Sequence, residues 1–238
     1  MSTLYQIGLN AVFGFTSAFL NSYVNGQVVP VALNDPDSKY IGILSSLVSA
    51  VAAGTSLIFG RVSPITGKGP ILILGAGCFF GVVFPFLVQP KATSYGWALL
   101  IVVYTLHGVG RATFEGTLKA TFADYFPYER EGAFANIILQ NGLSGAIGYI
   151  LTFNLLCDKP SRYCIEYKNG TLHDVLTFEL IVVMCAVLAV LGYLRASLIH
   201  QSERHGEHSS EEDQQGEEGG ATLLGDADHD SAPEGTYT

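Results

Sequence analysis

The stretch WALLIVVYTLHGVGRATFEGTLK (97–119) opens with ten uncharged, mostly apolar residues and then carries four ionisable side chains spaced four apart. These four side chains are His107, Arg111, Glu115 and Lys119. A helix needs about 20 mostly apolar residues to cross the hydrocarbon core of a bilayer, and this stretch has that length and character. Because a step of four residues advances only about 40° around a helix, the stretch predicts a membrane-spanning helix with charged groups along one face.

Five other long runs with few or no charges accompany this one: 4–33, 41–60, 70–88, 132–156 and 175–199. The chain is 49% hydrophobic and 14% charged, whereas soluble domains carry about 25% charged residues. The sequence therefore predicts an all-α membrane protein, a bundle of six transmembrane helices embedded in the lipid bilayer. We expect one transmembrane domain over residues 1–199.

The C-terminal residues have a different composition. Residues 199–238 contain eleven of the 21 acidic side chains and one of the 12 basic ones. Such a polar, acidic, Gly-rich segment cannot bury enough apolar surface to fold, so we expect residues 200–238 to form a disordered cytoplasmic tail. The acidic charge argues against nucleic acid as a partner.

The basic residues indicate the orientation. Seven of them fall on one side of the predicted membrane (Arg61, Lys68, Arg111, Lys119, Arg130, Arg195 and Arg204) and five on the other (Lys39, Lys91, Lys159, Arg162 and Lys168). The positive-inside rule therefore places both termini in the cytoplasm. Loop 157–174 then lies outside, where Cys157 and Cys164 could form a disulfide and the sequon at Asn169 could be glycosylated.

Motifs of soluble enzymes are missing from the sequence. It contains no Walker loop, no Cys or His pair at zinc spacing and no GxSxG elbow. We therefore expect no enzyme, no catalytic residue, no cofactor and no metal site.

Two predicted cytoplasmic loops are more informative. GRVSPITGKGP (60–70) contains Gly60, Gly67 and Lys68, and KATFADYFPYEREGAFAN (119–136) contains Asp124, Pro127 and Arg130. The first loop resembles the signature loop of the major facilitator superfamily, in which a Gly is followed seven positions later by Gly and a basic residue. The family's central Asp is replaced here by Pro64, which argues against the usual charge relay at this loop. The second loop resembles the linker between the fourth and fifth helices of a facilitator half.

The Gly-rich, acidic segment GVGRATFEG (108–116) and the amide-bearing run after residue 132 resemble the Unc-ninety-three-like branch of that superfamily. A facilitator has twelve helices in two halves, and this chain resembles the C-terminal half. The resemblance implies a secondary transporter that moves a small solute by alternating access. It also implies a partner, either a missing N-terminal half or a second copy in a homodimer. The branch includes regulators and trafficking partners of ion channels and receptors, which is the alternative function. The plasma membrane or an endolysosomal membrane is the expected location.

The charged stripe has two interpretations. Arg111 and Glu115 could form a structural pair between helices, or they could belong to a substrate or proton site in a central cavity. Because ionisable groups inside a membrane are costly and usually functional, we favour the cavity site. Its candidate residues are His107, Arg111, Glu115, Asn136, Gln140, Asn10 and Asn21. Glu179 is expected to face the outer interface.

Overall fold

The computed structural model describes residues 2–35, 37–89, 95–126, 128–156, 164–166, 172–192, 194–195 and 198. The described residues up to Leu194 form one compact unit. The acidic tail predicted over residues 200–238 lies outside the described residues, as do Cys157, Asn169 and Pro127.

The first helical segment is continuous but changes its winding. It runs through α1 (Ser2–Ala18), the π-helical η1 (Phe19–Val28) and α2 (Val29–Ala32). Pro30 sits in the first turn of α2, where its missing N–H leaves no hydrogen bond unmade. Asn21 and Asn25 lie within η1, so polar side chains are concentrated where the winding changes.

Five further helices among the described residues are long and apolar enough to cross a membrane. Four of them are α3 (Lys39–Thr66), α4 (Lys68–Val88), α7 (Arg130–Asn154) and the helix Val175–Gly192. The fifth is one continuous helix made of α5 (Trp97–Ala112), η3 (Thr113–Leu118) and α6 (Lys119–Tyr125). With the α1–η1–α2 helix, the described part of the bundle has six helices, and the predicted all-α membrane bundle is confirmed.

A small hairpin closes one end of this unit. Strand β1 (Cys164–Glu166) pairs antiparallel with β2 (Leu172–Asp174), with Ile165 opposite His173. His173 is buried, and its Nδ1 lies 2.9 Å from the carbonyl oxygen of Thr152 near the end of α7. The hairpin is thus held against the bundle. Cys164 is disulfide-bonded, whereas Cys78 and Cys185 are free thiols.

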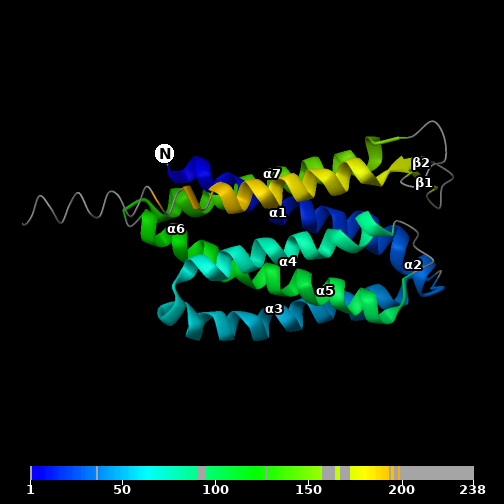
Figure 1. Ribbon diagram of the computed structural model, residues 1–238, viewed down its shortest axis with the longest axis horizontal. Coiled ribbons are helices and arrows are strands. Elements are labelled where there is room, and N and C mark those ends of the chain that lie inside the picture. Colours follow the sequence, from blue (N-terminus) through cyan, green and yellow to red (C-terminus); the bar gives the residue numbers. More distant parts are fainter. Residues whose placement is uncertain are drawn as a thin grey trace, which may run out of the picture. The chain divides into compact units, whose positions relative to one another are not determined.

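Close helix packing depends on glycine between α1 and α7. A Cβ added at Gly14 would lie 2.7 Å from the Asn141 carbonyl oxygen and 2.8 Å from the Gly145 nitrogen. Such distances leave no room for a side chain, so Gly14 permits the two backbones to approach. Helix α3 packs mainly on α5, and α4 packs on both α5 and η3 (Figure 1).

Helices α3 and α7 expose most of their surface. Only 17% of the apolar window of each is buried, compared with 50% for α4 and for the α5–η3–α6 helix. Their exposed side chains are largely apolar, as with Leu57, Ile58, Ile138 and Leu139. In water such faces would be strongly unfavourable, so lipid or further helices must cover them.

The position expected for Glu179 is wrong. Its exposed fraction is 0%, and both carboxylate oxygens have no hydrogen-bond partner among the residues that the structure describes. The preceding residue, Phe178, packs edge-on against Phe19 with ring centroids 5.5 Å apart. Because Phe178 packs in the core through this contact, the first turns of the helix lie in the core, and Glu179 is buried with them.

Candidate functional site

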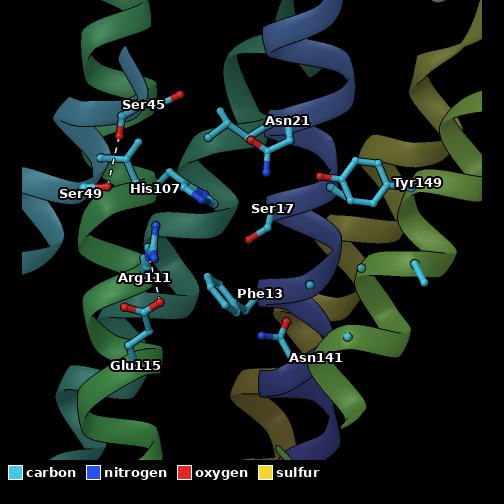
Figure 2. A pocket seen from close by; sticks show the side chains of 17 residues that line it. Phe13, Ser17, Asn21, Ser45, Ser49, His107, Arg111, Glu115, Asn141 and Tyr149 are labelled. Atoms are coloured by element: carbon cyan, nitrogen blue, oxygen red, sulfur yellow. Dashed lines mark hydrogen bonds and ion pairs between the residues drawn. The ribbon is translucent and has the colours of Figure 1, made fainter. Parts of the chain in front are cut away.

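A polar cavity of about 510 Å³ opens between four of the helices (Figure 2). Its walls come from α1 with η1, from α3, from α5 with η3, and from α7. The polar side chains that line it are Ser17, Asn21, Ser45, Ser49, His107, Arg111, Glu115, Asn141 and Tyr149. The structure therefore brings four of the seven predicted site residues, His107, Arg111, Glu115 and Asn21, to one cavity.

The charged side of the cavity is built by α5 and η3. Arg111 Nε donates a hydrogen bond to Glu115 Oε1 at 2.9 Å, one helical turn further on. The two side chains are 40% and 45% exposed, so the pair borders open space instead of being packed between helices. Lys119, the last residue of the stripe, is exposed at the start of α6 and does not line the cavity.

His107 lies deeper than this pair. It is 5% exposed, and its ring stacks on Phe13 at 6.4 Å and meets the edge of Phe79 at 5.8 Å. Within the described part of the chain, its Nδ1 has no hydrogen-bond partner. Aromatic packing therefore fixes the ring while one nitrogen stays available.

On the opposite wall, hydrogen bonds hold Asn21 in place. Its Oδ1 accepts from Asn25 Nδ2 at 3.2 Å, and the buried Tyr104 hydroxyl donates to Asn25 Oδ1. Asn25 and Tyr104 thereby link η1 to α5 behind the cavity wall. Of these three hydrogen-bonded residues, Asn21 is the one that lines the cavity.

Three predicted site residues lie elsewhere. Asn10 Nδ2 donates to Gln140 Oε1 at 2.8 Å, and Gln140 Nε2 donates to Asn136 Oδ1 at 3.1 Å. None of the three is among the residues that line this cavity. They join α1 to α7, because an amide in an apolar environment is satisfied by another amide.

Several cavity residues were missed by the sequence reasoning. Ser45 and Ser49 of α3 line the cavity, but neither was among the predicted site residues. Their spacing of four was the available signal, because it places both hydroxyls on one helix face. Tyr149 lies two turns beyond Asn141 on α7, and this spacing gave a second signal of the same kind.

The two loop motifs meet at the end of the bundle opposite the hairpin. Gly67 ends α3 with φ +81°, a left-handed conformation that favours glycine. Lys68 then begins α4, donates to the Ala120 carbonyl oxygen at 3.1 Å and forms an ion pair with Asp124. Arg130 is exposed at the start of α7. A Cβ at Gly60 would meet no described atom within 4 Å. One basic residue of the first motif thus pairs with the acid of the second.

Known proteins resemble this chain at the family level. Residues 11–227 match the sequence model of the Major Facilitator Superfamily. Protein unc-93 homolog A of Mus musculus is 28% identical over 168 residues, which cover 71% of this chain and 34% of that protein. The Homo sapiens protein of the same name is 28% identical over 169 residues, with the same two shares. MFS-type transporter ppz2 of Metarhizium majus is 29% identical over 105 residues, which cover 44% of this chain and 17% of that protein.

The chain spans about a third of the length of the Unc-93 relatives that it matches. No solved structure matches it significantly. The family match covers most of the chain, and it agrees with the helical bundle and with the loop motifs that carry Gly67, Lys68 and Asp124. The chain therefore belongs to the Major Facilitator Superfamily, in its Unc-93-like branch.

Proposed function

We propose that this chain forms one half of a facilitator-type transporter, which moves a small polar solute through the cavity by alternating access. The observation that carries the proposal is the Arg111–Glu115 pair, which is half exposed on the wall of a cavity of about 510 Å³. A purely structural pair would be expected to be enclosed by protein. An open, charged cavity among membrane-spanning helices suits a solute pathway.

The apolar surfaces of α3 and α7 support a second half. These two helices both contribute to the cavity walls and both expose long apolar faces beside it. Facilitators pack two six-helix halves around a site near the membrane midplane. We propose that six further helices cover these faces, supplied by a longer chain or by a second copy. The proposed membrane is the plasma membrane or an endolysosomal one, with both termini in the cytoplasm.

The test compares cells that express the wild-type protein with cells that express Arg111→Met and Glu115→Gln together. Replacing both charges leaves no lone ion behind, so the double variant should fold and reach the membrane in wild-type amounts. We expect the wild-type protein to change the cellular content of at least one polar solute, measured by untargeted mass spectrometry. The double variant should lose that change. Equal solute contents in the two, at equal membrane abundance, would contradict transport through this cavity.

The second candidate is a non-transporting regulator or trafficking partner of a channel or receptor. It is favoured by Pro64, which stands where the facilitator signature loop carries an Asp. A protein that only binds a partner does not need the two cavity charges. It would therefore keep its partner, recovered by cross-linking in the membrane, in the double variant that carries neither charge.

A further inference from the structure

We infer that the Arg111–Glu115 pair binds the head group of a zwitterion, a solute with an ammonium and a carboxylate bonded to the same carbon, as in an α-amino acid. This inference rests on the proposed transport function and specifies its substrate class. It follows from the hydrogen-bonding capacity of the pair, from the charge of the cavity wall and from the neutral groups around it.

The pair leaves most of its hydrogen-bonding capacity unused. The contact is a single bond from Arg111 Nε to Glu115 Oε1. Among the described residues, nothing bonds to the two terminal guanidinium nitrogens or to Glu115 Oε2. The terminal nitrogens form the planar fork that binds a carboxylate with two parallel bonds. The free carboxylate oxygen beside them can accept from an ammonium group.

The charge of the wall favours a solute without net charge. Arg111 and Glu115 are the basic and the acidic side chain among the described lining residues, and their opposite charges cancel. A solute with only a carboxylate would add an uncompensated negative charge beside Glu115. A solute with only an ammonium would add an uncompensated positive charge beside Arg111. A zwitterion meets both partners, and the four charges alternate in sign.

Neutral groups complete the site from three other helices. The Ser17 hydroxyl, the Ser45 hydroxyl and the Asn141 amide make no side-chain hydrogen bond within the described part of the chain. They come from α1, α3 and α7 and line the same cavity as the charged pair (Figure 2). Phe13 and Val48 add apolar wall, so the site can hold an uncharged side chain next to the charged head group.

A carbohydrate fits this arrangement less well. A polyol would use the hydroxyl and amide groups, but it would leave the guanidinium fork and the carboxylate oxygen without charged partners. A site that offers specific hydrogen-bonding groups discriminates against solutes that cannot use them. The matching solute therefore carries both charged groups on one carbon.

The experiment measures thermal stabilisation of the purified full-length protein by four matched solutes. L-leucine is the zwitterion, L-leucinamide the cation, N-acetyl-L-leucine the anion and 4-methylpentanamide the uncharged form. The same four forms of L-glutamine and L-phenylalanine cover other side chains. A ligand that binds only the folded state raises the unfolding temperature, so the shift reports binding without an assay of activity. We expect at least one zwitterion to bind about tenfold or more tightly than its three derivatives, the loss expected for one charge-assisted bond.

Two single variants then test the assignment of the charges. Glu115→Gln should transfer the preference to the N-acetyl anion, because Arg111 becomes the one charged partner. Arg111→Gln should transfer it to the amide cation. Lys119→Gln is the matched control, since this residue of the same stripe does not line the cavity and should leave the preference for the zwitterion unchanged. A merely structural pair would alter stability in these variants without exchanging the preferred solute.

The outcomes separate the two proposals. If a cation, an anion or an uncharged form binds the wild-type protein best, the zwitterion class is overturned. The zwitterion class is also overturned if none of the twelve solutes binds while the cells still show a solute change that depends on Arg111 and Glu115. Neither of these two outcomes contradicts transport through the cavity. If that solute change is also absent, transport and the inference both fail.

Discussion

Lys68, the first residue of α4, forms an ion pair with Asp124 in the last turn of α6. The two residues are 56 positions apart in the chain and come from the two loop motifs. Lys68 also donates to the Ala120 carbonyl oxygen at 3.1 Å, so its ammonium group links the start of one membrane helix to the end of another. This link remains although Pro64 occupies the position where the family carries an Asp.

The pair should hold the two helices in place without adding much stability. Its side chains are 28% and 62% exposed, and exposed ion pairs contribute about 0.2–1 kcal/mol. We therefore expect Asp124→Asn to lower the unfolding free energy by less than about 1 kcal/mol in detergent. Exchanging the charges, Lys68→Asp with Asp124→Lys, should restore the wild-type value. A loss of several kcal/mol in the single variant would show that the pair is more than a surface contact.

Gly14 should tolerate no side chain. A Cβ there would overlap the backbone of α7 at Asn141 and Gly145, so we expect Gly14→Ala to destabilise the bundle by about 1–3 kcal/mol. Gly77→Ala is the matched control, because nothing described lies within 4 Å of a Cβ at that position of α4. Thermal unfolding in the same detergent compares them. Equal unfolding temperatures would contradict the close packing of α1 on α7.

Replacing Glu179 by an apolar side chain should stabilise the protein. Both of its carboxylate oxygens are buried without a hydrogen-bond partner in the described structure, which costs about 1–3 kcal/mol. Glu179→Met removes these oxygens at similar length and should raise the unfolding temperature. Glu179→Gln keeps polar atoms in the same place and should gain less. If both variants unfold earlier than the wild-type protein, Glu179 has an interaction that its surroundings in the bundle do not reveal.

The orientation gives a further prediction. If both termini are cytoplasmic, the hairpin with Glu166 lies outside and the loop with Tyr128 lies inside. Both residues are exposed, so cysteines introduced at these positions can react. On intact cells with the protein at the plasma membrane, a membrane-impermeant thiol reagent should label Glu166→Cys. Tyr128→Cys should be labelled after permeabilisation. The reverse pattern would invert the assignment of both loops.

Much of the fold could be read from apolar length. The long uncharged runs gave the helices because the hydrocarbon core of a bilayer demands about 20 apolar residues from each. The change of winding in η1 and the burial of Glu179 could not be read in this way. Both depend on contacts between helices, such as that of Phe178 with Phe19, and periodicity within one helix carries no record of these contacts.

The candidate site was predictable where charge marked it. Arg111 and Glu115 stand out in an apolar run, and the structure places them on the cavity wall. Uncharged polar residues were harder to assign. Asn10 and Ser17 lie two turns apart on one face of the first helix, yet Asn10 bonds to Gln140 and Ser17 faces the cavity. Spacing gives the face of a helix, but the neighbouring helix decides whether that face is packed or open.

The accessibility of Ser49 to water tests the central claim most directly. Ser49 lines the cavity from α3, whereas Leu57 of the same helix is 73% exposed on an apolar face that lipid or further helices would cover. A hydrophilic maleimide reacts with thiolate, which forms in water and not in hydrocarbon. In a background without Cys78 and Cys185, we predict that Ser49→Cys reacts in the membrane-embedded protein and that Leu57→Cys does not. If Ser49→Cys is as unreactive as Leu57→Cys, the cavity holds no water and the transport account is contradicted.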